Sequence, residues 1–252
     1  MNKSRLLIKT ITLMFAVFMF VNTANSSEIR VAVASNFSET IKALSKRFEE
    51  KTGHRVVVIV GSTGKHYAQI KHGAPYDIFF AADKARPKLL DDEGVSIPSS
   101  RFTYAIGQLV LWSPTKGFIE DGLNVLHQDK FRYLALANPR LAPYGAAAQE
   151  ILQADGLWSE LQDKIVKGEN IGQTFQFVQS GNAELGFVAY SQVKTRIELM
   201  EGSVWVVPQS RYTPIEQQAV LLKDNAVARD FITFIRDGES KKLIESFGYR
   251  SL

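Results

Sequence analysis

Runs of β-branched and small residues alternate with helix-like stretches in the first third of the chain, and this alternation limits the possible folds more than any other feature. The runs cover residues 28–35 (EIRVAVAS), 54–60 (HRVVVIV) and 77–82 (DIFFAA). Parallel strands need a long crossover, usually a helix, to bring the chain back to the same edge of the sheet. The sequence therefore predicts an α/β protein built from parallel βαβ units with helices on both faces of the sheet.

The alternation restarts after Tyr104, which gives the chain a second half of the same kind. Its strand-like and helix-like segments are residues 108–113, 133–137, 146–155, 172–180, 184–189 and 203–207. One more strand and two helices, residues 217–222, 225–236 and 240–247, close the chain. We therefore expect two lobes with a ligand cleft between them, one formed by residues 27–105 and 209–252 and the other by residues 106–208.

The N-terminus has the pattern of a secretory signal. Lys3, Arg5 and Lys9 precede an apolar stretch that ends near Val21, and Ala24 and Ser26 then have the spacing of a cleavage site. The apolar stretch is shorter than the ~20 residues that a membrane-spanning helix needs. The sequence therefore predicts a signal peptide over residues 1–26, cleaved after export, and a mature protein in the periplasm.

Composition excludes several functional classes. The predicted signal carries three basic and no acidic residues, so its removal takes away most of the net charge of +4, and no basic stripe indicates binding to nucleic acid. The chain has no cysteine, and its four histidines lack the spacing of metal ligands, so we expect no direct metal ligand and no cofactor. Neither a G-x-S-x-G elbow nor a nucleophile paired with histidine is present, so we expect no enzymatic activity.

Three segments place the start of a helix directly after a strand or a turn of small and polar residues. They are residues 35–38 (SNFS), 61–64 (GSTG) and 142–145 (APYG). The first backbone N–H groups of a helix have no partner within the helix and bind anions without needing a lysine or arginine. Each segment alone is also an ordinary helix cap. Together the three segments indicate an anion site at the carboxyl edge of the strands, provided that they converge in the fold.

At this point the sequence resembles the periplasmic molybdate-binding family (ModA-type) of type II solute-binding proteins. The resemblance covers essentially the whole mature chain and rests on the stretches VAVASNFSETIKALSKRFEEKTGH, GSTGKHYAQIKHGAPYDIFFAAD, RFTYAIGQLVLWS, NPRLAPYGAAAQEIL and the closing FGY. It implies the two-lobed periplasmic-binding-protein-like fold of type II, with the ligand in the cleft between the lobes.

The resemblance also implies which residues hold a tetrahedral oxyanion with neutral donors. Ser35 and Asn36 in the first loop, and Ser62 and Thr63 in the second, are the side-chain and amide donors of one lobe. The other lobe is expected to contribute backbone amides. These amides belong to Tyr144 and Ile171. Some members add a tyrosine hydroxyl after the LG-x-V strand. Ala189 falls at that place here, so the candidate for this hydroxyl is Tyr190, the next residue, and the alternative is the phenol of Tyr144.

The implied function is capture of molybdate or tungstate and delivery to the permease of an ABC importer by a monomeric receptor that closes around the ion. Within this class, sulfate, phosphate and thiosulfate are the alternative ligands. Cavity size would select against sulfate, and the O–H of protonated phosphate would find no acceptor in a site made of donors. Two other classes remain open: an exported enzyme on the same fold, and a receptor domain that presents its liganded form to a sensor.

Overall fold

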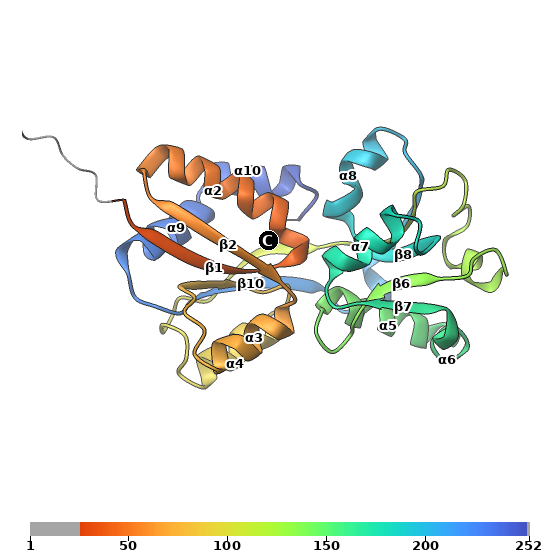
Figure 1. Ribbon diagram of the computed structural model, residues 1–252, viewed down its shortest axis with the longest axis horizontal. Helices are drawn as coiled ribbons and strands as arrows, with labels where there is room; N and C mark the ends of the chain where they lie inside the picture. The colour runs from red at the N-terminus through yellow and green to blue at the C-terminus, as the bar shows by residue number, and fades with distance from the viewer. Residues whose placement is uncertain (1–25, 251–252) are drawn as a thin grey trace, which may run out of the picture.

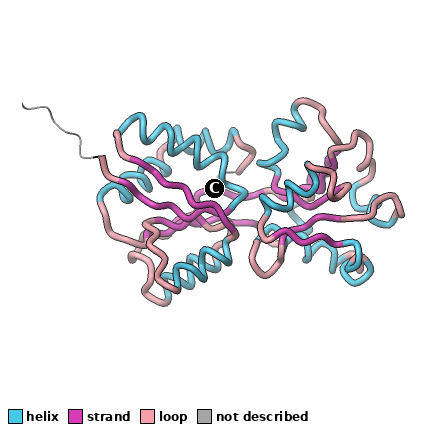
Figure 2. The backbone as a smooth tube through the Cα atoms, in the orientation of Figure 1, coloured by secondary structure: helices cyan, strands magenta, loops and turns pink. Residues whose placement is uncertain are grey.

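The computed structural model describes residues 26–250, which form two five-stranded sheets, each covered by helices on both faces (Figures 1 and 2). The strands are β1 (Glu28–Ala34), β2 (Arg55–Gly61), β3 (Ile78–Phe80), β4 (Phe102–Gly107), β5 (Leu109–Ser113), β6 (Leu134–Ala137), β7 (Ile165–Gly168), β8 (Leu185–Ala189), β9 (Ser203–Val206) and β10 (Ile215–Leu221). Apart from Ser26, the predicted signal peptide lies outside these residues. Within them, no helix has the length and apolar character needed to cross a bilayer.

The helices connect and cover the strands. The α-helices are α2 (Ser38–Thr52), α3 (Thr63–Lys71), α4 (Ala85–Asp92), α5 (Pro143–Ala154), α6 (Leu157–Glu160), α7 (Ile171–Gln179), α8 (Tyr190–Glu198), α9 (Ala226–Arg236) and α10 (Gly238–Ser246). The short 3-10 helices are η1 (Ser35–Phe37), η2 (Gly122–His127), η3 (Gln162–Lys164) and η4 (Gln209–Arg211).

The first sheet has the strand order β2-β1-β3-β10-β4. Strands β1, β2 and β3 are parallel, which confirms the predicted βαβ units, whereas β10 runs antiparallel to its neighbours β3 and β4. Alternate residues of β1 face opposite sides of the sheet: Val31 and Val33 pack with α2 and α9, and Ala32 packs with α3 and α4. A strand buried on both faces has few polar positions, which is why the run is apolar from Val31 to Ala34.

The second sheet repeats this design with the order β7-β6-β8-β5-β9. Strand β6 is parallel to β7 and β8, and β5 is antiparallel to β8 and β9. Leu109 and Leu111 of β5 pack toward α5, while Val110 and Trp112 pack toward α7 and α8. The two halves predicted from the sequence therefore fold as two separate layered units, as the two-lobed fold class requires.

The chain crosses between the two sheets twice. It first leaves β4 at Gly107 and enters β5 at Leu109, and it later leaves β9 at Val206 and returns to the first sheet in β10. Strand β4 thus continues in the first sheet to Gly107, two residues past the expected lobe boundary at residue 105. Both crossings lie side by side where the two halves meet (Figure 1).

Two helix starts differ from the sequence prediction. The helix start expected within residues 35–38 divides into the 3-10 turn η1 and the helix α2, whose first residue is Ser38. The helix expected to begin at residue 146 begins at Pro143, because proline at the first helical position lacks only an N–H that would have had no partner there. Both differences lengthen the helical starts at the junction of the sheets.

Candidate functional site

The three helix-start segments converge on one small cavity at the junction of the two sheets. Its volume of about 10 Å³ is far below the range of pockets that hold drug-sized molecules. The lining residues are Ala34, Ser35, Asn36, Gly61, Ser62, Thr63, Ala82, Ala142, Pro143, Tyr144, Asn170 and Ile171. They follow the carboxyl ends of strands in both sheets, which is where open α/β folds bind their ligands.

The first sheet contributes hydroxyl groups whose oxygens are already used as acceptors. Ser35 Oγ accepts the N–H of Gly172 at 3.1 Å, and Thr63 Oγ1 accepts the N–H of Ala82 at 3.0 Å. Ser62 Oγ accepts the N–H of Lys65 at 3.4 Å. A hydroxyl has one proton to donate in addition to its lone pairs. Each of these three groups can therefore donate its proton to an acceptor in the cavity.

The second sheet contributes backbone N–H groups. Helix α5 places Tyr144 in its first turn, and helix α7 begins at Ile171 after the cap Asn170. Asn170 Oδ1 accepts the N–H of Gln173 at 3.0 Å, which keeps the first turn of α7 in place. First-turn N–H groups have no carbonyl partner within their own helix and carry the positive end of the helix dipole. Both helix starts thus present donors to the same cavity as the three hydroxyls.

No residue that lines the cavity carries a charged side chain. Burial raises the pKa of Tyr144 well above its ordinary value of 10.0, so its phenol stays protonated. Burial also lowers the pKa of His66, which lies behind Gly61, below its ordinary value of 6.5, so the imidazole is neutral at neutral pH. The site therefore offers neutral donors and no carboxylate that would repel an anion.

Contacts between the two halves lie next to the residues that line the cavity, and we call them the rim contacts. They join Ser35 Oγ to Gly172 N at 3.1 Å, Gly64 N to Leu141 O at 2.8 Å, Lys65 Nζ to Glu169 Oε1 at 3.0 Å, and Arg86 Nη2 to Arg140 O at 2.8 Å. A Cβ atom at Gly64 would lie 3.0 Å from the Cα atom of Leu141, so a larger residue here would require the two halves to shift by a few tenths of an ångström. The structure is thus that of a closed cleft.

The structure brings together six of the seven residues expected at the site. The seventh, Tyr190, does not line the cavity. Its ring packs closely against the backbone of Gly248, where an added Cβ would lie 2.6 Å from Cδ1, and its N–H donates to the carbonyl of Gln108 at 2.9 Å. Tyr190 therefore packs where the C-terminal segment meets the first crossing.

Sequence reasoning missed a buried glutamine beneath the cavity. Gln217 of β10 is fully buried and accepts hydrogen bonds from Asn36 Nδ2 at 2.8 Å and from Tyr104 Oη at 3.0 Å. Its Nε2 donates to Tyr144 Oη at 3.2 Å. The available signal was the pair of glutamines directly before the apolar residues of β10, since a polar residue that is buried needs hydrogen-bond partners.

A closed two-lobed α/β fold with an uncharged, donor-lined cavity defines a solute-binding protein, and comparisons with known proteins agree. Residues 29–250 match the family described as bacterial extracellular solute-binding protein. The sequence is 45% identical to the molybdate-binding protein ModA of Azotobacter vinelandii over 90% of this chain and 91% of that protein. It is 44% identical to the ModA protein of Rhodobacter capsulatus over 90% of this chain and 89% of that protein.

A solved structure resembles the whole described fold. The periplasmic molybdate-binding protein of Azotobacter vinelandii superposes with a TM-score of 0.85 at 41% sequence identity, covering 89% of this chain and 99% of that one. The chain belongs to the bacterial extracellular solute-binding family, and within it to the ModA type.

Proposed function

We propose that this protein is an exported, monomeric receptor that captures molybdate or tungstate in the periplasm and delivers it to the permease of an ABC importer. The observation that carries the proposal is the uncharged cavity into which hydroxyl and backbone N–H donors of both sheets converge. A dianion is stable in such a site when each of its oxygens accepts hydrogen bonds, and bonds to an ionised acceptor are roughly twice as strong as neutral ones. The names of its ModA relatives point to the same ligand.

The proposed ligand groups are the side chains of Ser35, Asn36, Ser62 and Thr63 and the backbone N–H groups of Tyr144 and Ile171, all of which line the cavity. We assign Tyr190 a packing role instead. The proposed lobes are residues 27–105 with 209–252, and residues 106–208, joined by the two crossings. Opening about these crossings would separate the rim contacts and expose the ion, as in other hinge-closing proteins.

The cavity also favours this reading over an exported enzyme. In the described part of the chain, no group of three or more acidic or histidine side chains is gathered to hold a metal ion. The side chains that line the cavity hold no general base, because its nearest imidazole, His66, lies behind the wall and hydrogen-bonds Val33 O and Gln69 Oε1. A site that binds and releases an unchanged ion needs none of these groups.

The test is a thermal-shift series on the mature protein with molybdate, tungstate, sulfate, phosphate and thiosulfate, followed by calorimetric titration of each ion that responds. An ion at about 1,000 times its Kd stabilises the folded state by about 4 kcal/mol, which corresponds to a rise in Tm of several degrees. We expect molybdate and tungstate to raise the Tm and the other ions not to. A response to sulfate, phosphate or thiosulfate alone would show that this ion, and not molybdate or tungstate, is the ligand. No response to any of the ions would contradict the oxyanion site.

A further inference from the structure

A chain of buried polar groups connects the two lobes beneath the cavity. Gln217 is at its centre, 0% exposed and outside the cavity lining. The chain runs from Asn36 Nδ2 to Gln217 Oε1 at 2.8 Å, and from Gln217 Nε2 to Tyr144 Oη at 3.2 Å. Asn36 and Gln217 belong to the first sheet and its loops, whereas Tyr144 belongs to α5 on the second sheet. Two residues that line the cavity from opposite lobes are therefore joined through one carboxamide.

The backbone is shaped to allow this connection. The pairing of β10 with β4 shifts register between Gln217 and Gln218, and such irregularities re-aim side chains. Gly107 ends β4 directly beside the bond: a Cβ atom there would lie 2.2 Å from Tyr144 Oη and 2.7 Å from Gln217 Nε2. No residue other than glycine leaves room for the phenol and the carboxamide to meet.

The donors and acceptors of the chain leave one group unmatched. Tyr249 Oη donates to the carbonyl of Asn36 at 2.7 Å, and Tyr104 Oη lies 3.0 Å from the carbonyl of Ala81. Asn36 Oδ1 is buried without a hydrogen-bond partner. A buried carbonyl oxygen without a donor is unfavourable by itself. An oxyanion in the adjacent cavity cannot correct this, because it supplies only acceptors.

Turning over both carboxamides gives the Asn36 side-chain oxygen a donor and leaves an N–H group in its former place, where an oxyanion can accept it. The nitrogen and oxygen of a carboxamide exchange places when it rotates by half a turn. Gln217 then donates to Asn36 Oδ1, and Tyr144 donates its phenol proton to Gln217 Oε1. The Asn36 amide nitrogen takes the place of the unmatched oxygen, at the expense of its contact with Tyr249, and becomes free to donate. The spare donor of the chain is thus the Tyr144 phenol in one orientation and the Asn36 amide in the other.

We propose that Gln217 is a positioning residue that couples Asn36 to Tyr144. Binding of an oxyanion favours the orientation of the two carboxamides in which Asn36 donates to the ion. The inference rests on the proposed function, since it explains how the donors of the proposed oxyanion site are oriented. Gln217 itself does not contact the ion. Its carboxamide makes the orientations of the two cavity residues depend on each other across the lobes.

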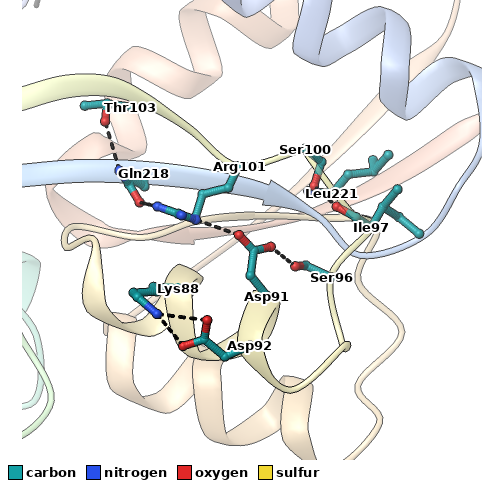
Figure 3. A network of polar contacts seen from close by, with 10 residues as sticks. All are labelled: Lys88, Asp91, Asp92, Ser96, Ile97, Ser100, Arg101, Thr103, Gln218 and Leu221. Carbon is teal, nitrogen blue, oxygen red and sulfur yellow. Dashed lines mark hydrogen bonds and ion pairs between the residues drawn. The ribbon is translucent and has the colours of Figure 1, made fainter.

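The adjacent residue supplies a matched control. Gln218 lies on the same strand but faces away from the cavity, where its Nε2 donates to Thr103 Oγ1 at 3.0 Å and its Oε1 accepts from Arg101 at 2.9 Å (Figure 3). Gln217→Met and Gln218→Met remove the same chemical group from buried sites of one strand. We expect Gln217→Met to weaken molybdate binding about tenfold or more and Gln218→Met to leave it within about threefold, by calorimetric titration.

A purely structural role is separated from positioning by the pH profile of Gln217→Glu. An ionised carboxylate in the chain accepts from both neighbours and repels a dianion, whereas the protonated acid restores a donor. The titratable groups that contact Gln217 or its partner Asn36 are Tyr104, Tyr144 and Tyr249, and burial raises all three pKa values above 10. We expect the affinity of Gln217→Glu for molybdate to rise about tenfold or more between pH 8.5 and pH 6, and that of the wild type and Gln218→Glu to stay flat.

The outcomes separate the two claims. Titration of the wild-type protein decides the proposed function by itself. Equal affinities of Gln217→Met and Gln218→Met, or a flat profile for Gln217→Glu, would overturn the positioning role even where the wild type binds molybdate tightly. If the wild type binds no oxyanion, the coupling is decided without ligand: Tyr144→Phe should shift the side-chain amide resonances of Gln217 and Asn36 together in NMR spectra, and unchanged resonances would overturn it.

Discussion

The two walls of the cavity use different parts of the polypeptide for the same purpose. The wall on the first sheet presents side-chain hydroxyls, of which Ser62 and Thr63 are at most 2% exposed. The wall on the second sheet presents the backbone N–H groups at the starts of α5 and α7. Side-chain donors are set by residue identity, whereas backbone donors are set by where a helix begins. The first wall should therefore be sensitive to conservative substitutions that the second wall tolerates.

The largest effect should come from deleting two hydroxyls of the first wall together. In Ser62→Ala/Thr63→Ala the ion loses two donors, each of which contributes about 1–3 kcal/mol when its absence leaves a buried acceptor unmatched. We expect molybdate affinity to fall by about 100-fold or more in calorimetric titration. The fold should survive with a loss of about 2–4 kcal/mol, because Ser62 also caps α3 and Thr63 Oγ1 accepts the buried N–H of Ala82.

The control for that variant is Ser180→Ala/Thr233→Ala, which removes two exposed hydroxyls that do not line the cavity. It should bind molybdate like the wild type. Affinity within threefold of the wild type for Ser62→Ala/Thr63→Ala, with native circular dichroism, would contradict the assignment of the first wall.

A smaller and more specific effect should follow from removing one backbone donor of the second wall. Ile171 is the first residue of α7, a position at which proline keeps helical geometry and lacks only the N–H. Asn170 before it is extended, with φ −143° and ψ 171°, as a residue preceding proline prefers. We expect Ile171→Pro to bind molybdate about 5- to 50-fold more weakly than Ile171→Ala.

Ile171→Ala is the matched control, since it loses the same buried side chain but keeps the N–H. Its free energy of unfolding should fall by about 2–4 kcal/mol in urea titration, because Ile171 is 3% exposed, with affinity within threefold of the wild type. Equal affinities of the two variants would show that this N–H does not contact the ion. Helix α7 would then contribute no backbone donor to the second wall.

A moderate effect on stability, rather than on binding, should come from the buried histidine behind the first wall. Burial lowers the pKa of His66 in the folded state, so between that value and 6.5 the unfolded chain binds more protons than the folded one. Stability should therefore fall as the pH drops below about 6.5. His66→Gln should show a smaller loss of Tm between pH 7.5 and pH 5; an unchanged loss would place the pH dependence elsewhere.

The smallest effect should come from the exposed ion pair of the rim contacts. Lys65 and Glu169 join the two halves at 3.0 Å, but their side chains are 53% and 45% exposed. Solvent-exposed pairs of this kind contribute about 0–1 kcal/mol and are screened by salt. Lys65→Ala should change molybdate affinity less than about fivefold, and the difference should shrink when NaCl is raised from 50 mM to 500 mM. A larger, salt-independent loss would indicate that Lys65 acts on the ion itself.

The features that were predictable from the sequence are those that depend on residues close together along the chain. Strand β1 was recognised because residues facing both sides of its sheet are apolar, and α2 because Ile41, Leu44 and Phe48 share one buried face that ends at Gly53. Strand β7 was missed, since Ile165 and Val166 are only partly buried, Lys167 is exposed, and the strand has no long apolar run. Helix α8 was missed because most of its residues are polar and only Val193 is fully buried.

The site divides in the same way. The loops at residues 35–38, 61–64 and 142–145 were visible as helix starts, but only the packing of the two sheets brings them to one cavity. The role of Gln217 could not be predicted, because its partner Asn36 lies 181 residues away in sequence and its partner Tyr144 lies 73 residues away. Gly107 likewise shows its purpose only once the phenol that it accommodates is in place.

The rim contacts have a consequence for how long an ion stays bound. An ion enclosed between Ser35, Gly64 and their partners on the opposite half leaves only after those contacts have separated, so dissociation is gated by the opening of the cleft. Variation in affinity among related complexes resides mainly in the dissociation rate. Substitutions at the rim should therefore change the residence time of the ion more than its rate of entry.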